Sequence, residues 1–332
     1  MGVPRCGGRN FESDLIVRER PTRGLVSMKS QNPVIISVGI CAHNEGQNLG
    51  RLLDTLLEEP VSEIIVAASG CLDDTEEITR GVVARDSRVR LISETVRKGK
   101  TYAFNQILRE YAGSFLVSIP ADVVPSRGFV MKLIERMTPD VAVVGGLPIP
   151  NNPAGRVIDD ISRLLWELHN RTLESLSASN ELRHVSGELF ALRRGVIDRI
   201  PANTVNEDAF IAIAAKAAGY RVVVCPEALV TIAGTRTIGD YVRQRRRVLY
   251  GHLQAKKEFG RFPSVIEFEF PARPKFVWGL IRSLFRGRSR PFLPLFVGSL
   301  LEVIAFSLAV GDHLTGRTQY IWKQAISTKR LE

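Results

Sequence analysis

Strands and helices alternate at short, regular intervals from Pro33 to about residue 120, and this alternation constrains the fold more than any other feature of the chain. Residues 34–40 form a β-branched run typical of a strand, and residues 48–57 carry leucines at helical spacing. The order then repeats, with strands expected at 63–67, 89–93 and 114–119 and helices at 74–85 and 101–111. Such alternation indicates βαβ units and a mainly parallel sheet flanked by helices, so the predicted class is α/β.

The second half of the chain continues this pattern with wider spacing. A small-residue helix is expected at 209–218, directly after the acidic pair Glu207 and Asp208 and before Gly219, which suits a helix C-terminus. Further strands are expected at 141–144, 188–192 and 221–225, and a further helix at 157–176.

Polar segments follow several predicted strands, at 41–46, 68–75 and 119–123. Ligands of open parallel sheets bind at the carboxyl ends of the strands. We therefore expect the functional site at this edge of the sheet.

The two ends of the chain differ from its middle. Residues 1–32 are basic and polar without an apolar core, so they are expected to be a disordered leader and not a secretory signal. Met28 would serve as an alternative start just ahead of the first strand. Beyond residue 260 the sequence becomes amphipathic and aromatic at 276–285 and then apolar at 292–310.

A helix over the apolar segment 292–310 would be roughly 28 Å long, close to the thickness of a hydrocarbon core. Glu302 within it would cost roughly 3 kcal/mol at the centre of a bilayer. The sequence leaves open whether this helix spans a membrane, lies in its interface or is buried as a C-terminal helix. In the first two cases, residues 261–332 form an amphipathic and apolar region of membrane association.

Basic residues give the chain a formal net charge of +10 and gather in two clusters. Neither cluster is interleaved with aromatic residues and no nucleic-acid-binding motif occurs, so we expect no nucleic-acid partner. Two interpretations stay open for each cluster: contact with phosphate or anionic lipid, and a basic face exposed to solvent. The clusters are Arg243, Arg245, Arg246 and Arg247, and Arg282, Arg286, Arg288 and Arg290.

Four cysteines lie far apart, without CxxC spacing. This argues against a zinc site or a disulfide framework and fits a reducing compartment. They are Cys6, Cys41, Cys71 and Cys225.

The loops after the predicted strands carry motifs suited to a phosphorylated ligand. Gly99 and Lys100 stand at the start of a predicted helix, where backbone N–H groups and a cation form an anion site. Asp122 follows the fourth strand, and its carboxylate is a hard oxygen ligand of the kind that divalent cations prefer.

Six segments, in their order along the chain, resemble those of family 2 glycosyltransferases. The resemblance covers about 215 residues, and it implies a GT-A-type, Rossmann-like catalytic domain over residues 33–260. The segments are Cys41-Ala42-His43-Asn44-Glu45, Ala68-Ser69-Gly70-Cys71-Leu72-Asp73-Asp74-Thr75, Lys98 to Asn105, Pro120-Ala121-Asp122, Val185-Ser186-Gly187-Glu188 with Asn206-Glu207-Asp208, and Gln244-Arg245-Arg246-Arg247-Val248.

The resemblance implies a nucleotide-sugar donor site, although several family positions are changed. Ala68 and Ser69 stand where the family has two acids, Pro120 replaces the first acid of the Asp-x-Asp motif, and Val248 replaces a tryptophan. Asp122 is then the residue expected to hold Mg²⁺ or Mn²⁺ against the donor diphosphate. The donor-binding residues implied are Ala42, Asn44, Glu45, Ser69, Asp73, Lys100, Asp122, Gln244 and Arg247.

The acceptor side is implied by the later motifs. An inverting transfer needs one carboxylate to take the proton of the attacking hydroxyl, and Asp208, with Glu207 beside it, is the candidate base. Ser186 and Gly187 would lie on the acceptor side.

The sequence therefore predicts an inverting transferase that moves a sugar from a UDP- or GDP-linked donor to a lipid-linked or membrane-proximal glycan acceptor. Its expected place is the cytoplasmic face of the cell membrane, as a peripheral or single-span protein, or else the cytoplasm. A polyprenyl-phosphate sugar synthase is the nearest enzymatic alternative. A non-catalytic protein that binds nucleotide sugars is the alternative from another class, because the acidic motifs are degenerate.

Overall fold

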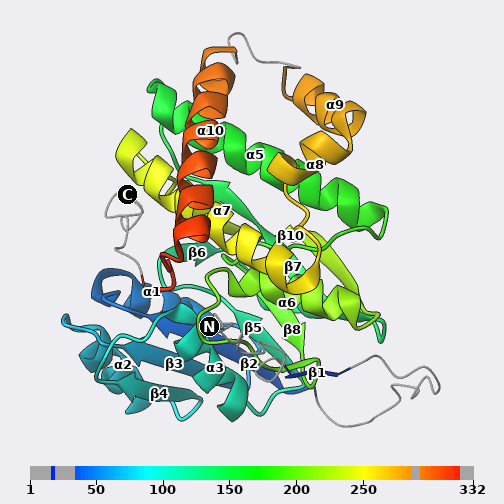
Figure 1. Cartoon of the computed structure of the whole chain (residues 1–332). Coiled ribbons are helices and arrows are strands. Elements are labelled where there is room, and N and C mark those ends of the chain that lie inside the picture. Colours follow the sequence, from blue (N-terminus) through cyan, green and yellow to red (C-terminus); the bar gives the residue numbers. More distant parts are fainter. Residues whose placement is uncertain (1–15, 19–33, 286–291, 322–332) are drawn as a thin grey trace, which may run out of the picture.

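A computed structural model describes residues 16–18, 34–285 and 292–321. Its centre is an eight-stranded sheet in the order β4-β3-β2-β5-β8-β7-β10-β6 (Figure 1). Strands β2 to β5, at the first end of that order, pair in parallel, as do β7 and β10. Within this sheet, the antiparallel pairs are those of β8 with β5 and β7, and that of β6 with β10. The strands are β2 (Ile36–Ala42), β3 (Glu63–Ser69), β4 (Val89–Glu94), β5 (Phe115–Ser118), β6 (Val123–Pro125), β7 (Val141–Pro150), β8 (Phe190–Arg193) and β10 (Arg221–Ile232).

Helices cover both faces of this sheet and bury its apolar side chains. On one face, α1 (Gly46–Leu57), α2 (Thr75–Val83) and α4 (Phe129–Glu135) complete one hydrophobic core. On the other, α3 (Lys100–Glu110), α6 (Glu207–Ala217) and the C-terminal part of α5 (Val157–Ala178) complete a second core. This is the α/β, mainly parallel architecture that the alternating pattern predicted.

The predicted elements are present, with differences at their ends. Strands β7 and β10 continue well beyond 141–144 and 221–225, and they pair in parallel along both ends of their length. Pro148 and Pro226 lie in the extended parts, and such residues mark a strand end in a sequence pattern. Strand β6 and helix α4, which the sequence did not predict, are both short.

The prediction that residues 1–32 are a disordered leader is wrong at Ile16–Val17. Ile16–Val17 forms strand β1, which pairs antiparallel with β9 (Ile197–Arg199). Arg18 extends the contact with an ion pair of 2.9 Å to Asp198. The rest of the predicted leader, Met28 included, lies outside the described residues, as does Cys6.

Three helices follow the last strand of the sheet along the chain. The 22-residue α7 (Ile238–Phe259) is followed by α8 (Ile266–Ala272) and α9 (Pro274–Phe285). The sequence did not predict α7 because arginines interrupt the apolar residues of its first half, among them the buried Tyr241. Thr237 caps its start by accepting a hydrogen bond of 3.1 Å from the backbone of Asp240.

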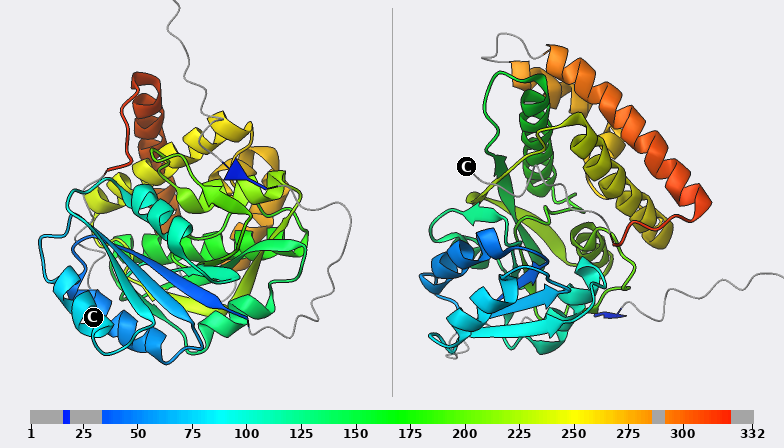
Figure 2. Two further views of the ribbon diagram at one scale, coloured as in Figure 1. Left: turned by 90° about the horizontal axis from the view of Figure 1, so that it is seen from below. Right: turned by 90° about the vertical axis from the view of Figure 1, so that its left-hand side faces the viewer.

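Helix α10 (Phe292–Thr315) packs lengthwise on α7 and also contacts α5 (Figure 2). Only 28% of its most apolar stretch is buried, although by length and composition α10 could cross a membrane. It is therefore not the buried C-terminal helix that the sequence allowed. Its inward face is narrow and its outward face is broad and apolar, with Phe292, Leu293, Phe296, Leu300, Val303, Ile304, Phe306, Leu308 and Leu314 exposed.

Candidate active site

Two adjoining cavities open at the carboxyl edge of the sheet. The larger, which we call the donor cavity, has a volume of about 420 Å³ and is lined by the ends of β2 and β3, the start of α3 and the middle of α7. The smaller, the acceptor cavity, has about 130 Å³ and lies between α5, α6, α7 and α8. Both cavities are lined by Lys100, Trp166, Glu188, Gln244 and Arg247.

Most of the residues predicted for the site meet at these cavities. The donor cavity is lined by Ala42, Glu45, Ser69, Lys100, Asp122, Gln244 and Arg247. The acceptor cavity is lined by Ser186, Gly187, Glu207 and Asp208.

Asn44 and Asp73 line neither cavity. Asn44 accepts a hydrogen bond of 2.8 Å from the backbone of Leu72, and its positive φ of 55° shapes the turn. Asp73 accepts hydrogen bonds from the backbones of Gly46 and Thr75, at 2.9 and 3.1 Å. Although partial burial opposes it, these bonds hold the pKa of Asp73 below its usual value. Both side chains join the first two loops to each other.

A group of opposite charges occupies the boundary between the two cavities. Lys100 Nζ lies 2.5 Å from the buried carboxylate of Glu207. Burial alone would lower the pKa of Lys100, but Glu207 raises it above its usual value, so the lysine is a fixed cation. Arg247 faces Glu207, Asp208 and Glu188, whose charges only partly offset the lowering of its pKa by burial.

Asp208 is held at this boundary by its own backbone and by the acceptor loop. The N–H of Ala209 donates a hydrogen bond of 2.8 Å to its carboxylate, and the backbone of Gly187 donates another. A Cβ on Gly187 would lie 2.9 Å from Asp208 Oδ2, so this close approach requires glycine. Burial raises the pKa of Asp208 above its usual value against the opposing charges of Lys100 and Arg247.

Hydrogen bonds between neighbouring segments hold the acidic pair, Glu207 and Asp208, in place. Asn105, from the motif that begins at Lys98, donates a hydrogen bond of 2.7 Å to the carbonyl of Ile200 and accepts one of 2.9 Å from its N–H. Asn206 donates one of 2.8 Å to the carbonyl of Val248. The segment that presents Glu207 and Asp208 is thereby tied to α3 and α7.

Glu188 is a site residue that the sequence did not single out. It lines both cavities, and burial together with the charge of Asp122 raises its pKa to about 7. Burial also raises the pKa of Asp122. The only sequence signal for Glu188 was its place next to Ser186 and Gly187.

Asp122 and Glu188 fit a divalent cation, because two carboxylates that disfavour each other's charge offer hard oxygen ligands beside the donor cavity. In the described part of the chain, no three His, Cys, Asp or Glu side chains are grouped to hold a metal by themselves. Two protein carboxylates plus diphosphate oxygens and water would suffice for a cation of this kind.

Glu94 is an acid next to one of the positions at which the donor motif has lost its acids, although it lines neither cavity. Ser69, at a family acidic position, donates a hydrogen bond of 2.7 Å to Glu94 at the end of β4. The other carboxylate oxygen of Glu94, Oε1, is buried and has no hydrogen-bond partner among the described residues. His43 lines the donor cavity and lies 2.7 Å, through Nδ1, from the carbonyl of Ser69.

The four arginines of the first cluster have different surroundings. Arg243 and Arg247 line the donor cavity, whereas Arg245 and Arg246 bind acidic residues of α8 and α10. Of the second cluster, only Arg282 lies within the described residues.

Comparisons with known proteins agree with this geometry. Residues 33–251 match the family described as "Glycosyltransferase like family 2". The structure is similar to the mannosyltransferase PcManGT of Pyrobaculum calidifontis, solved in complex with GDP-Man and Mn²⁺, with a TM-score of 0.62, 19% identity, and 86% and 89% of the two chains covered. Glucosyl-3-phosphoglycerate synthase of Mycobacterium tuberculosis, solved with Mn²⁺ and UDP, gives a TM-score of 0.45 at 22% identity over 67% of this chain and 78% of that one.

A curated relative is glycosyltransferase AglD of Haloferax volcanii, 28% identical over 125 residues. The match covers 36% of this chain and only 20% of AglD. The family match spans well over half of the chain, and the fold and the grouped motif residues agree with it. The chain therefore belongs to the glycosyltransferase-like family 2 and has the GT-A fold.

Proposed function

We propose that this glycosyltransferase inverts the anomeric centre, taking a sugar from a UDP- or GDP-linked donor and passing it to a glycan hydroxyl at a membrane surface. The observation that carries the proposal is the position of Asp208. It lines the acceptor cavity, at the boundary where Lys100 and Arg247 face the donor cavity.

The proposed step moves one proton and exchanges one bond. Asp208 takes the proton of the acceptor hydroxyl, whose oxygen attacks the anomeric carbon from the face opposite the leaving group. The bond from that carbon to the diphosphate oxygen breaks, and the nucleoside diphosphate leaves with the electron pair. The raised pKa of Asp208 suits a base that works near neutral pH.

Cations on the donor side would stabilise the negative charge of the leaving group. Lys100 at the start of α3 adds its charge to that of the helix N-terminus, and Arg247 can donate two hydrogen bonds to one phosphate. A divalent cation held by Asp122 and Glu188 would supply further charge neutralisation. The similar mannosyltransferase binds GDP-Man with Mn²⁺, which supports both the donor class and the metal.

Helix α10 supports seating at a membrane surface rather than a span. Two acids on its inner face are paired with α7: Glu302 with Arg245 at 2.8 Å, and Asp312 with Arg246. Because α7 also lines the donor cavity, it cannot lie in hydrocarbon, and α10 packs along its length. The exposed apolar face of α10 suits the boundary between headgroups and acyl chains.

The catalytic part is tested by release of nucleoside diphosphate from a panel of UDP- and GDP-sugars, with Mn²⁺ and with a chelator. We expect release from one donor class, and a loss of roughly 10²–10⁴-fold in kcat for Asp208→Asn. Equal, slow release by wild type and Asp208→Asn with every donor would favour the non-catalytic alternative.

The membrane part is tested by flotation with vesicles that contain anionic lipid. Phe296→Ser combined with Leu300→Ser should abolish flotation, because both exposed side chains face away from α7. Flotation equal to that of wild type would refute the seating of α10.

A further inference from the structure

Three histidine rings line the acceptor cavity in a row, which is continued at each end by another aromatic ring. The ring centroids of His169 and His184 are 5.4 Å apart, and those of His184 and His252 are 5.7 Å apart, each pair meeting edge to face. Trp166 continues the row at 5.3 Å from His169, and Phe268 continues it at 5.9 Å from His252. The three histidines come from α5, the loop before β8, and α7, and all line the acceptor cavity.

The nitrogen atoms of this row are not satisfied by the protein. His169 Nε2, His184 Nδ1 and both ring nitrogens of His252 are buried and have no hydrogen-bond partner within the described residues. His184 and His252 are 4% and 2% exposed. Unpaired buried polar groups are costly, so four such atoms in residues that line one cavity indicate a polar occupant.

Burial keeps these rings uncharged. It lowers the pKa of His184 to about 3 and holds those of His169 and His252 well below the usual value, with Arg245 adding repulsion. A neutral imidazole has one N–H donor and one nitrogen acceptor. A hydroxyl group can pair with either kind of ring nitrogen, because it both donates and accepts hydrogen bonds.

The charges that line the cavity disfavour an anionic occupant. Its three basic side chains are Lys100, Arg245 and Arg247, against four carboxylates from Glu188, Glu207, Asp208 and Glu267. Lys100 is paired with Glu207, and Arg245 is bonded to Glu267 and to Glu302 of α10. Neither Lys100 nor Arg245 offers a phosphate an uncompensated charge there, and Arg247, whose charge is only partly offset, also lines the donor cavity, where we propose that it binds the donor diphosphate. A neutral ring with several hydroxyls would meet no repulsion from the four carboxylates.

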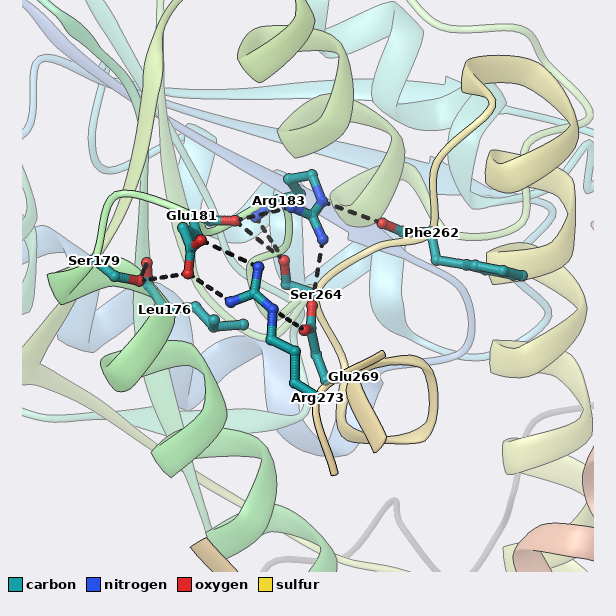
Figure 3. Close-up of polar contacts among 8 residues, drawn as sticks. All are labelled: Leu176, Ser179, Glu181, Arg183, Phe262, Ser264, Glu269 and Arg273. Atoms are coloured by element: carbon teal, nitrogen blue, oxygen red, sulfur yellow. Dashed lines mark hydrogen bonds and ion pairs between the residues drawn. The ribbon is translucent and has the colours of Figure 1, made fainter. Parts of the chain in front are cut away.

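A polar network fixes the two segments that close the cavity (Figure 3). Arg183 donates a hydrogen bond of 3.3 Å to Glu269 of α8 and one of 3.4 Å to the carbonyl of Phe262, and its N–H donates one of 3.0 Å to Ser264. Arg273 donates two hydrogen bonds to Glu181, at 2.6 and 3.1 Å. The loop that carries His184 is thereby tied to α8, which carries Glu267, so the row is held in place before any ligand arrives.

We propose that the histidine row is the acceptor subsite and that it binds an uncharged sugar ring through that ring's hydroxyl groups. The inference rests on the proposed function, because it places the attacking hydroxyl beside Asp208. A volume of about 130 Å³ is room for roughly four waters at their liquid volume, which is the scale of one small ring rather than of a longer glycan. Trp166 supplies an aromatic surface at the junction of the two cavities, where the family motif would have placed a tryptophan at Val248.

The first test compares acceptor classes, with the full chain, Mn²⁺ and the donor that supports release of nucleoside diphosphate. The acceptor probes are a panel of methyl glycosides of neutral hexoses and of N-acetylhexosamines, and a short polyprenyl phosphate in detergent. Transfer to at least one glycoside, and none to the polyprenyl phosphate, is expected. Transfer to the polyprenyl phosphate alone, or to neither class, overturns the subsite. If wild type releases no nucleoside diphosphate from any donor, the proposed function itself has failed.

The second test separates binding from packing. His184→Phe and His252→Phe keep an aromatic ring but remove the unpaired nitrogens, so we expect the acceptor KM to rise at least about 10-fold while the midpoint of thermal unfolding does not fall. The donor KM should change much less. His184→Asn, which keeps a donor and an acceptor, should recover part of the acceptor affinity.

His313→Phe is the matched control, because His313 contacts Tyr250 on the outer side of α7 and lines neither cavity. Its acceptor KM should equal that of wild type. A lower unfolding midpoint with an unchanged acceptor KM in His184→Phe and His252→Phe would show that the row only packs the interior, and would refute the proposal.

Discussion

Arg245 and Arg247 lie two residues apart on α7, and both are surrounded by acidic side chains, yet the two regions they belong to differ. Arg245 is hydrogen-bonded to Glu302 at 2.8 Å and to Glu267, and these carboxylates raise its pKa although burial opposes them. Around Arg247, burial dominates and its pKa is lowered. One arginine is therefore fully compensated by the protein, and the other only in part.

The difference separates a docking contact from a ligand site. Tyr241 donates a hydrogen bond of 2.6 Å to Glu302, so the carboxylates around Arg245 are committed to holding α8 and α10 on α7. The carboxylates around Arg247 include the proposed base, and its guanidinium lines the donor cavity. A cation whose charge is only partly offset is suited to an anionic ligand such as a diphosphate.

The largest effect is therefore expected from Arg247. Arg247→Lys keeps the charge but loses the two parallel hydrogen bonds to a phosphate, and we expect kcat to fall roughly 10²-fold or more. Release of nucleoside diphosphate measures this. Arg246→Lys is the control on the same helix, because Arg246 binds Asp312 and lines neither cavity. If both variants lost activity equally, the contrast between the two regions would not hold.

A smaller effect, measured on stability, is expected from Arg245, which also lines the acceptor cavity. Arg245→Met would leave the partly buried Glu267 and Glu302 without their cation. Breaking a fully buried pair costs roughly 3–5 kcal/mol in the free energy of unfolding, and this is the upper bound for the loss. The triple variant Arg245→Met, Glu267→Gln, Glu302→Gln removes the whole charged group and should recover most of that loss. Chemical denaturation measures each variant.

An Arg245→Met variant as stable as wild type would mean that α10 is held on α7 without this charged group, by its apolar contacts and by the pair of Asp312 with Arg246.

The sequence was sufficient for the sheet and for the motif residues, because each lies next to a strand whose apolar pattern is local. Lys100, Asp122 and Asp208 were found in this way, and all three line the cavities. Glu188 was not found as a site residue, and neither was the contact of Glu94 with Ser69, because both depend on which strands lie side by side.

The helices α7, α8 and α10 show even more clearly that contacts between distant segments cannot be read from a local pattern. The apolar residues of α7 are interrupted by its arginines and are therefore hard to detect as one face. The acids that neutralise its Arg245 and Arg246 come from 22 to 66 residues further along the chain. The histidine row is assembled from three such separated elements. Glu302 indicated a cost within an apolar segment, but only the fold shows that Arg245 offsets it.

The smallest effect is expected from the acidic pair at the proposed metal site, and it appears as a dependence on pH. The pKa of Glu188 is about 7 in the folded protein, above its ordinary value of 4.5. Between these values the folded state keeps a proton that the unfolded state has released. The stability from this group is therefore complete below the unfolded pKa and is lost as the pH rises through about 7.

A divalent cation binds the deprotonated carboxylate, so its stabilising effect should grow over the same range. We expect Mg²⁺ or Mn²⁺, added with UDP or GDP, to raise the unfolding midpoint by a few degrees more at pH 8 than at pH 6, with ionic strength held constant. Glu188→Gln should be more stable than wild type at pH 8 without metal, and should lose most of the pH dependence of the metal effect. A metal response that is the same at both pH values in wild type would mean that Glu188 does not face the cation. Asp122 would then be the only protein carboxylate proposed here to hold it.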